Sequence, residues 1–233
     1  MSSYPTTTSL AEIGAIVADP GRASMLIALA DGTARTAREL ADCAGITPQT
    51  ASTHLAKLVG CGFVRMEKRG RHHYHRIASG EVAQLIETMH LAATALAPRG
   101  KRIRRAADDV SMRLARSCYD HLAGRVGVAL TDALAARDYV RVDAPDVEVT
   151  EAGAKFLSDW GVDLAPARRS KRPFCRACID WSERRPHLAG AVGSAILDHV
   201  LGLGWMRRRQ DSRVLSITSA GHIGFSTVFG FRA

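Results

Sequence analysis

Residues 47–76 gather side chains of the types that contact nucleic acid. When residues 48–59 are projected as a helix at about 100° per residue, Ala51, Leu55 and Leu58 form one narrow apolar stripe. The opposite side is polar, and such side chains reach base edges and phosphates when a helix enters the major groove. The alternative interpretation is a solvated helix face. The candidate DNA contacts of this helix are Thr47, Gln49, Thr50, Ser52, Thr53, His54 and Lys57.

A basic segment follows at once. Residues 65–76 hold five arginines and lysines against one acid, Glu67, and the pattern predicts two strands turned near Arg69-Gly70. Such a hairpin would place positive charge over the DNA backbone or minor groove. Its candidate contacts are Arg65, Lys68, Arg69, Arg71 and Tyr74. His72, His73 and His75 share the hairpin, and we expect them to face solvent or phosphate, because no cysteine or carboxylate completes a four-ligand metal set.

The elements that must position these residues follow from apolar spacing and capping residues. Thr36 and Glu39 form a capping box that starts a short helix, and Thr47-Pro48 starts the next one. Helices are expected over residues 10–17, 20–30, 36–45, 47–59 and 79–97, and a hairpin over 63–77. Short helix, tight turn, helix and basic hairpin is the order of a winged helix-turn-helix.

The stretch from Glu39 to Leu58, followed by Gly62-Phe63-Val64, Arg69-Gly70-Arg71 and Tyr74, is similar to the ArsR/SmtB family of bacterial winged-helix repressors. The resemblance covers residues 10–97. It implies a homodimer joined mainly through the first and last helices of this half. It also implies a double-stranded DNA operator with an inverted repeat.

The chain departs from the family at its metal sites. The cysteine pair of thiolate-sensing members falls on Thr36 and Arg38, and the Asp/His set of zinc-sensing members is reduced to His90. We expect Cys43 to be a small buried hydrophobic residue. The input to such a regulator is therefore expected in the rest of the chain.

Sulfur and imidazole side chains lie in that second half. The candidate effector or thiol-sensor residues are Cys118, His121, Cys175, Cys178, Trp181 and His187. Cys175-x-x-Cys178 has the spacing of a zinc site, and a bound metal would take Cys118, Cys175, Cys178 and His187. Thiol redox chemistry stays open, because nearby arginines such as Arg176 would lower a thiol pKa. A small-molecule effector also stays open. No cofactor is required for DNA binding, and Trp181 is expected to anchor a core.

An internal repeat organises this half. Residues 121–142 and 187–208 align without gaps and are identical at nine of 22 positions, and the similarity extends over 121–153 and 187–221. Each copy is expected to form a helix, a β-hairpin and the start of another helix. The repeat is either a duplicated scaffold without a site or a pair of copies with a pocket between them. The alignment pairs His121 with His187 but Cys118 with Arg184, so the repeat is not expected to include the thiols.

The expected fold class is mainly α with small β-hairpins (α+β). The domains are a winged helix-turn-helix for DNA binding and dimerisation over 10–97, a basic linker or helix continuation over 98–110, and a sensory domain over 111–233. Residues 1–98 carry nine basic and eight acidic residues, whereas residues 99–233 carry 23 and 15, a balance that favours a polyanionic partner. No apolar run suits a membrane span, and the N-terminus lacks the pattern of a signal peptide, so a cytoplasmic location is expected.

We therefore expect a homodimeric transcriptional repressor whose C-terminal domain senses a metal, a thiol oxidation or a small molecule. A nonspecific architectural DNA-binding protein is the first alternative, because the arginines of the second half are clustered. An enzyme with a Cys/His nucleophile is a weaker alternative, because none of the usual catalytic motifs is present.

Overall fold

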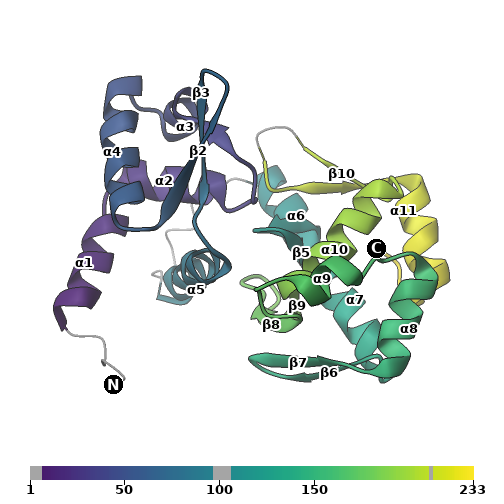
Figure 1. The fold of residues 1–233 in the computed structure, drawn as a ribbon. Coiled ribbons are helices and arrows are strands. Elements are labelled where there is room, and N and C mark those ends of the chain that lie inside the picture. The colour runs from purple at the N-terminus through teal and green to yellow at the C-terminus, as the bar shows by residue number, and fades with distance from the viewer. Residues whose placement is uncertain (1–6, 97–105, 210–211) are drawn as a thin grey trace. The chain divides into compact units, whose positions relative to one another are not determined.

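The computed structural model describes residues 7–96, 106–209 and 212–233. The chain divides into an N-terminal unit, Met1–Ile86, and a C-terminal unit, Glu87–Ala233 (Figure 1). The elements of the first unit are α1 (Thr7–Val17), α2 (Pro20–Leu29), β1 (Arg35–Thr36), α3 (Ala37–Ala44), α4 (Pro48–Gly60), β2 (Val64–Arg69) and β3 (His72–Ile77), and α5 (Gly80–Leu96) crosses the boundary.

Local capping sets the helices of the N-terminal unit. The capping box predicted at α3 is confirmed, because the Thr36 amide donates to Glu39 Oε2 (2.6 Å) while the Glu39 amide donates to Thr36 Oγ1 (3.3 Å). Gly45 ends this helix with a φ of 65°, a left-handed conformation that costs glycine little. Thr47 caps α4 through its hydroxyl. Because α3 ends at Gly45 and α4 is capped at Thr47, only a tight turn lies between the two helices.

The predicted hairpin gains a third strand. β2 and β3 pair antiparallel with Arg69 opposite His72, and β1 adds to β3 through Arg35 opposite His75. A strand of two residues has no periodicity, and for that reason the sequence did not reveal β1. Helices and sheet bury one apolar core, and the winged helix-turn-helix is confirmed. Its fully or nearly fully buried residues include Met25, Leu26, Leu29, Leu40, Ala51, Leu55, Leu58, Val64 and Ile77.

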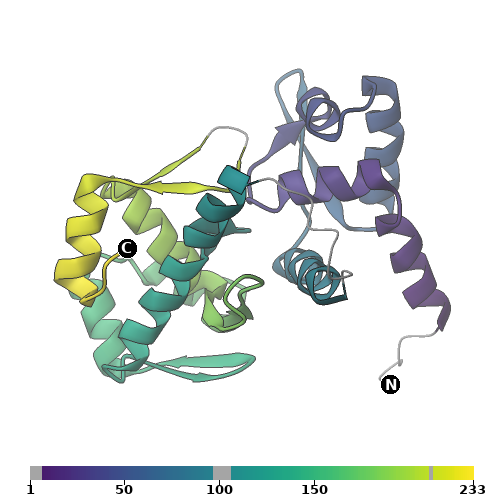
Figure 2. The same ribbon diagram turned by 180° about the vertical axis from the view of Figure 1, so that it is seen from behind.

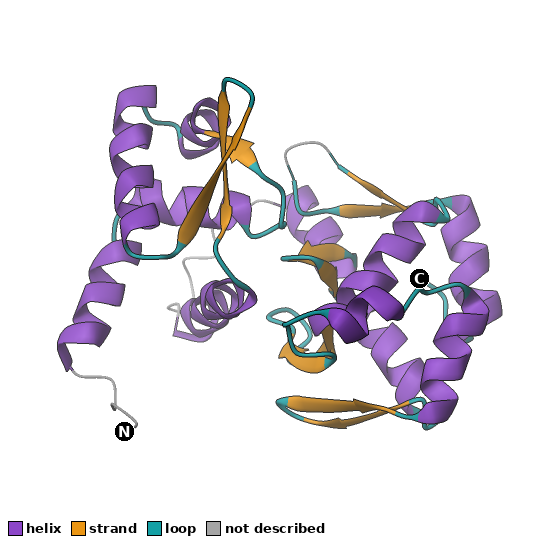
Figure 3. Ribbon diagram, in the orientation of Figure 1, coloured by secondary structure: helices purple, strands orange, loops and turns teal. Residues whose placement is uncertain are grey.

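The C-terminal unit contains two copies of one element order, which Figure 3 shows as short strands among helices. After α6 (Ala106–Leu114), the first copy comprises β4 (Arg116–Cys118), β5 (His121–Ala123), α7 (Arg125–Ala135), β6 (Val140–Asp143), β7 (Asp146–Val149) and α8 (Glu151–Trp160). After α9 (Ala165–Arg169), the second copy comprises β8 (Arg176–Ile179), β9 (Pro186–Ala189), α10 (Gly190–Gly202), β10 (Met206–Arg208), β11 (Leu215–Ile217) and α11 (Ser219–Gly224), followed by a π-helical turn, η1 (Phe225–Phe229). Each copy therefore starts with a hairpin that the sequence did not predict.

The two copies are interlocked. α7 of the first copy packs against β9 of the second, and α10 of the second packs against β5 of the first. β5 and β9 lie side by side (Figure 1). At the far end, η1, yellow in Figure 2, packs against α7. The shared core includes Leu122, Leu130, Leu134, Leu157, Leu188, Val192, Ile196, Leu197, Phe225 and Phe229.

Glycines permit the close packing of each helix on the strand that precedes it. A methyl group on Gly127 would lie 2.5 Å from the Leu122 carbonyl oxygen, and one on Gly193 would lie 2.5 Å from the Leu188 carbonyl oxygen, closer than packed atoms allow. The histidine of the other copy lies beside each glycine, with His187 Cβ 3.7 Å and His121 Cβ 3.2 Å from the added methyl groups. The repeated glycines therefore let each helix lie close to its own strand and beside the histidine of the other copy.

None of the described helices is long and apolar enough to cross a bilayer. The expected linker over 98–110 lies mostly outside the described residues, as does the basic cluster of Arg99, Lys101, Arg102, Arg104 and Arg105. The last residues of the expected linker, from Ala106 onward, belong to α6.

Candidate functional site

The polar side of α4 is a continuous exposed face. Ala51, Leu55 and Leu58 are buried against the core, as the projection predicted, and this packing fixes the rotation of the helix. The side chains at Thr47, Gln49, Thr50, Ser52, Thr53 and Lys57 are exposed. Ser52 and Thr53 donate their hydroxyls to the carbonyls of Pro48 and Gln49, one turn earlier on the helix.

His54 differs from the other residues of this group. It is half-buried, with Nδ1 3.3 Å from Arg22 Nη1 and Nε2 3.4 Å from Asp19 Oδ1. Asp19 is also the N-cap of α2. His54 therefore holds α4 against the start of α2, a role that a pattern of exposed polar positions cannot distinguish from DNA contact.

The hairpin of β2 and β3 presents the predicted cations. Arg65, Lys68, Arg69 and Arg71 are exposed and Tyr74 is half-buried, with the Arg69 guanidinium 6.0 Å from the centre of its ring. Glu67 lies among these cations. Its carboxylate is 3.4 Å from Arg65, 3.2 Å from Arg69 and 3.6 Å from Arg76, so one acid partly neutralises the basic strand.

The remaining histidines and Cys43 of this unit lie apart from any metal cluster among the described residues. His72 and His73 are exposed near the hairpin turn. His75 is buried, which lowers its pKa, so the expectation that it faces solvent or phosphate is wrong. Cys43 is exposed, so the expectation that it is a buried hydrophobic residue is wrong. It falls on the solvent side of α3, whose buried side contains Leu40 and Ala41.

In the C-terminal unit, four of the six predicted sensor residues come together. One ligand atom from each of Cys118, His121, Cys178 and His187 lies within 4.8 Å of the others, and all four residues are at most 4% exposed. Cys118 lies opposite His121 in the β4–β5 hairpin, and Cys178 lies opposite His187 in the β8–β9 hairpin. The two sulfur atoms are 3.9 Å apart.

The expectation that the repeat excludes the thiols is therefore wrong. Cys118 and Cys178 occupy the same position in their hairpins, although two residues separate Cys118 from His121 and eight separate Cys178 from His187. The longer loop shifted the ungapped alignment, so that Arg184 fell opposite Cys118. The common signal is Cys-x-Asp, present as Cys118-Tyr-Asp120 and Cys178-Ile-Asp180.

Cys175 and Trp181 do not join this cluster. Cys175 lies at the bend before β8 and enters the main core, whereas Cys178 lies within β8 and meets the histidines. Burial raises the pKa of Cys175 to about 12, and the neighbouring Cys178 and burial raise that of Cys118 to about 12. The expectation of thiol pKa values lowered by nearby arginines is wrong at both. Trp181 is buried under the Arg116 guanidinium, 4.5 Å away.

A buried ion pair ties the copies together beside the cluster. Arg116 Nη2 of the first copy donates to Asp180 Oδ2 of the second (2.9 Å), and both side chains are 0% exposed. Asp180 also accepts the amides of Gly124 (2.7 Å), Ser182 (2.9 Å) and Glu183 (3.1 Å). Although burial opposes ionisation, Arg116 and His187 hold the pKa of Asp180 below its usual range.

The expected pocket between the copies is nearly closed. The space enclosed by Leu122, Gly127, Leu130 and their counterparts Leu188, Gly193 and Ile196 is about 10 Å³, room for one water molecule at most.

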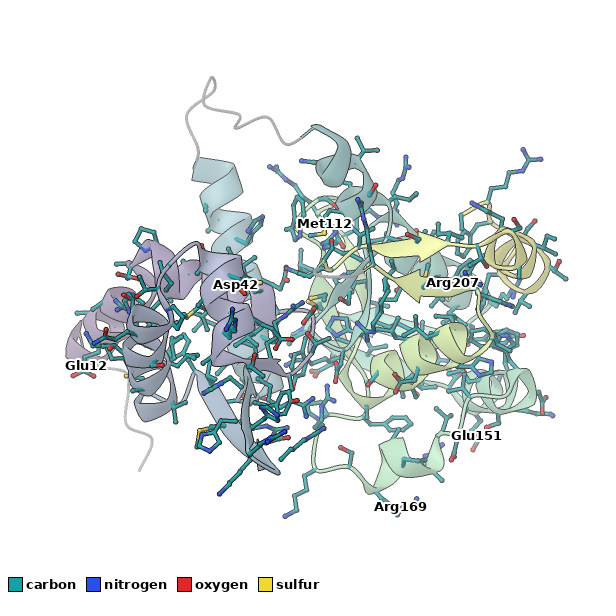
Figure 4. The ribbon with its side chains drawn as sticks, turned by 90° about the horizontal axis from the view of Figure 1, so that it is seen from above. Glu12, Asp42, Met112, Glu151, Arg169 and Arg207 are labelled. Carbon is teal, nitrogen blue, oxygen red and sulfur yellow. The ribbon has the colours of Figure 1, made fainter. Side chains whose placement is uncertain are left out.

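The basic clusters of this unit lie on separate elements, with Arg169 at the end of α9 and Arg207 on β10 (Figure 4). Arg172, three residues after Arg169, donates a hydrogen bond to the Asp120 carboxylate.

Comparison with known proteins identifies the N-terminal fold. A family model described as a helix-turn-helix domain matches residues 17–67. The chain is 40% identical over 218 residues to an HTH-type transcriptional regulator, YdfF, of Bacillus subtilis, and the match covers 93% of this chain and 95% of that protein.

Shorter matches involve only the N-terminal part. The HTH-type regulator CmtR of Mycobacterium tuberculosis is 35% identical over 79 residues, which span 34% of this chain and 66% of that regulator. Among solved structures, the cadmium metal-sensor CMTR of the same species is 32% identical with a TM-score of 0.31, covering 42% of this chain and 98% of that one. Reduced HlyU from Vibrio cholerae is 25% identical with a TM-score of 0.34, covering 36% and 87%.

The match to YdfF extends through both units, so that regulator shares the C-terminal unit of this chain as well as its helix-turn-helix. YdfF and CmtR are both HTH-type transcriptional regulators. The chain belongs to the family of HTH-type transcriptional regulators, and its N-terminal unit has the winged helix-turn-helix that the resemblance to ArsR/SmtB repressors predicted.

Proposed function

We propose that the protein is a homodimeric repressor that reads an inverted-repeat operator with α4 and the β2–β3 hairpin, and that its C-terminal unit receives the input. The observation that carries the proposal is the exposed face of Gln49, Thr50, Thr53 and Lys57 on a helix whose opposite stripe is fully buried. A helix anchored in this way presents the same side chains to every DNA molecule it meets.

Footprinting on the promoter region of the protein's own gene tests sequence reading. A repressor of this kind protects a discrete palindrome, with half-sites about one duplex turn apart. Continuous protection along the DNA, with equal affinity for unrelated sequences, contradicts the proposal and favours the architectural alternative.

Substitutions on the two surfaces should have different effects. Gln49→Ala or Thr53→Ala should cost about 5–150-fold in affinity for the operator and much less for unrelated DNA, because base contacts carry the specificity. Arg71→Ala should weaken binding to all sequences and lower the salt slope by about one, because a phosphate contact is lost. Fluorescence anisotropy over a salt series measures both, with Lys155→Ala on α8 as an exposed cation control that should change neither.

Glu67→Gln should strengthen DNA binding. The carboxylate lies within 3.6 Å of three arginines of the hairpin, so its removal frees positive charge without changing the shape of the side chain. We expect tighter binding to every sequence and a salt slope steeper by up to about one. An affinity that stays the same or falls places the hairpin away from the DNA.

Exposed apolar residues support a homodimer. Leu10 on α1 is 71% exposed and Met89 on α5 is 37% exposed, so each of the two helices that the family resemblance places in the dimer interface has an apolar side chain open to a partner. Sedimentation should give a particle of twice the 25.1 kDa chain mass. If the protein is a monomer at the concentrations at which it binds DNA, the proposal that a two-fold symmetric dimer binds an inverted repeat is contradicted.

An input to the C-terminal unit acts only if it binds two states of the protein with different affinity. It must favour a state in which the two α4 helices no longer match the half-sites. Of the three inputs that the sequence left open, the nearly closed space between the copies speaks against an organic molecule there.

A further inference from the structure

We propose that Cys118, His121, Cys178 and His187 form a tetrahedral site for a divalent metal ion of the zinc class. The ion would join the two repeat copies within the C-terminal unit of one chain. The site goes beyond the proposed repressor function and does not depend on DNA binding.

The donor set and its spacing fit zinc. Two thiolates and two imidazoles are a common set for structural zinc, and two sulfur atoms bound tetrahedrally at about 2.3 Å lie about 3.8 Å apart. The observed sulfur separation is 3.9 Å. A disulfide requires about 2.05 Å, so the two side chains are spaced for a shared ion.

The histidines lack the contacts that buried imidazoles usually have. Within the described part of the chain, neither ring nitrogen of His121 or His187 makes a hydrogen bond, although both residues are buried. Buried polar atoms without partners are costly. A metal ion that took one nitrogen from each ring would remove that cost at two residues at once.

Each histidine also has a carboxylate beside its Nδ1. Asp120 Oδ1 lies 3.5 Å from His121 Nδ1, and Asp180 Oδ2 lies 3.7 Å from His187 Nδ1. Metal-bound histidines commonly direct their other nitrogen to a carboxylate, which favours the tautomer with its lone pair free for the ion. Arginines hold both carboxylates: Arg172, between α9 and β8, binds Asp120, and Arg116 of the first copy binds Asp180 of the second.

Charge balance suits the buried position. Two thiolates and a divalent ion sum to zero, whereas either alone would leave a net charge where water is excluded. The ligands come from both copies, one cysteine and one histidine from each hairpin. Occupancy of the site therefore closes a bridge between β4–β5 and β8–β9 and should stabilise the fold of the C-terminal unit.

Cobalt titration of the reduced, chelator-treated full chain tests the site. We expect one Co²⁺ per chain, with the intense visible bands of tetrahedral cobalt, a thiolate charge-transfer band, and displacement by Zn²⁺. Saturating Zn²⁺, at about 1,000 times its Kd, should raise the Tm of the C-terminal unit by about 10 °C. The absence of tetrahedral bands overturns the proposal.

Cys178→Ser and its matched control Cys175→Ser separate this site from the Cys-x-x-Cys motif. Cys178→Ser should remove one thiolate from the cobalt spectrum and weaken binding more than 100-fold, beyond the loss typical of an outer residue. Cys175→Ser, three residues away in the main core, should keep the stoichiometry and the spectrum. Equal losses in the two variants overturn the assignment.

A measurement on the unaltered chain covers the case in which Cys178→Ser fails to fold. Zn²⁺ should slow the alkylation of Cys118 and Cys178, read by mass spectrometry, and leave the exposed Cys61 unchanged. Under mild oxidation, Zn²⁺ should also prevent a Cys118–Cys178 disulfide. Alkylation and oxidation that proceed equally fast with and without Zn²⁺ contradict the proposal, whatever the protein does with DNA.

Discussion

Asp180→Asn should lower the free energy of unfolding of the C-terminal unit by about 3–5 kcal/mol, a large part of the stability of an ordinary domain. The substitution keeps the shape of the side chain but removes its charge. Arg116 would then be a buried cation without its counterion, packed over the Trp181 ring and away from water. Breaking one partner of such a pair costs far more than the pair itself contributes.

Urea unfolding in the presence of a chelator, followed by tryptophan fluorescence, measures this loss without a contribution from metal. Asp132→Asn is the matched control, because Asp132 pairs with Arg185 at 2.7 Å with both side chains about half exposed. An exposed pair of this kind contributes about 0–1 kcal/mol. Similar losses in the two variants would show that the pair with Arg116 is not buried in solution.

Replacing both members of the buried pair separates the charge from the hydrogen bonds. Many buried ion pairs can be exchanged for apolar residues at little cost. Here the double variant Arg116→Met with Asp180→Leu should remain destabilised, because the amides of Gly124, Ser182 and Glu183 lose their acceptor. Recovery to the stability of the unaltered chain would contradict this account of Asp180.

Gly153→Ala should destabilise the first copy by about 3 kcal/mol or more. A methyl group at this position would lie 1.9 Å from the Tyr139 carbonyl oxygen, and backbone cannot move aside as a side-chain end can. The shift would also break the cap of α8, in which the Gly153 amide donates to Thr150 Oγ1 at 3.0 Å. Gly221→Ala should act in the same way, because its methyl group would lie 2.1 Å from the Trp205 carbonyl oxygen.

Gly202→Ala is the control for both glycines, since no atom lies within 4 Å of the added methyl group at the end of α10. Alanine is the better helix former, so this variant should be neutral or gain up to about 1 kcal/mol. Thermal unfolding of the three variants provides the comparison. If Gly153→Ala unfolds at the same temperature as Gly202→Ala, the close approach of α8 to Tyr139 does not exist in solution.

The N-terminal unit could be predicted in detail from the sequence because its signals are local. A capping box, a proline at the first turn, a glycine at the helix end and a stripe of Ala51, Leu55 and Leu58 act within a few residues of one another. These local signals predicted α3, α4 and the hairpin and therefore which polar side chains face outward. The exception, His54, is decided by its contact with Arg22, 32 positions away in the chain.

The sequence also determined that the second half contains a repeat and that three of the five cysteines lie there together with His121 and His187, but only the tertiary structure decided which of these side chains meet. Cys175-x-x-Cys178 suggested a pair, whereas Cys175 lies at a bend before β8 and enters the main core, apart from Cys178. The cluster instead joins Cys118 to Cys178, 60 positions apart, through two hairpins whose strands have three or four residues each. Strands so short have too little periodicity to predict, and the packing of one hairpin against another depends on the whole core between them.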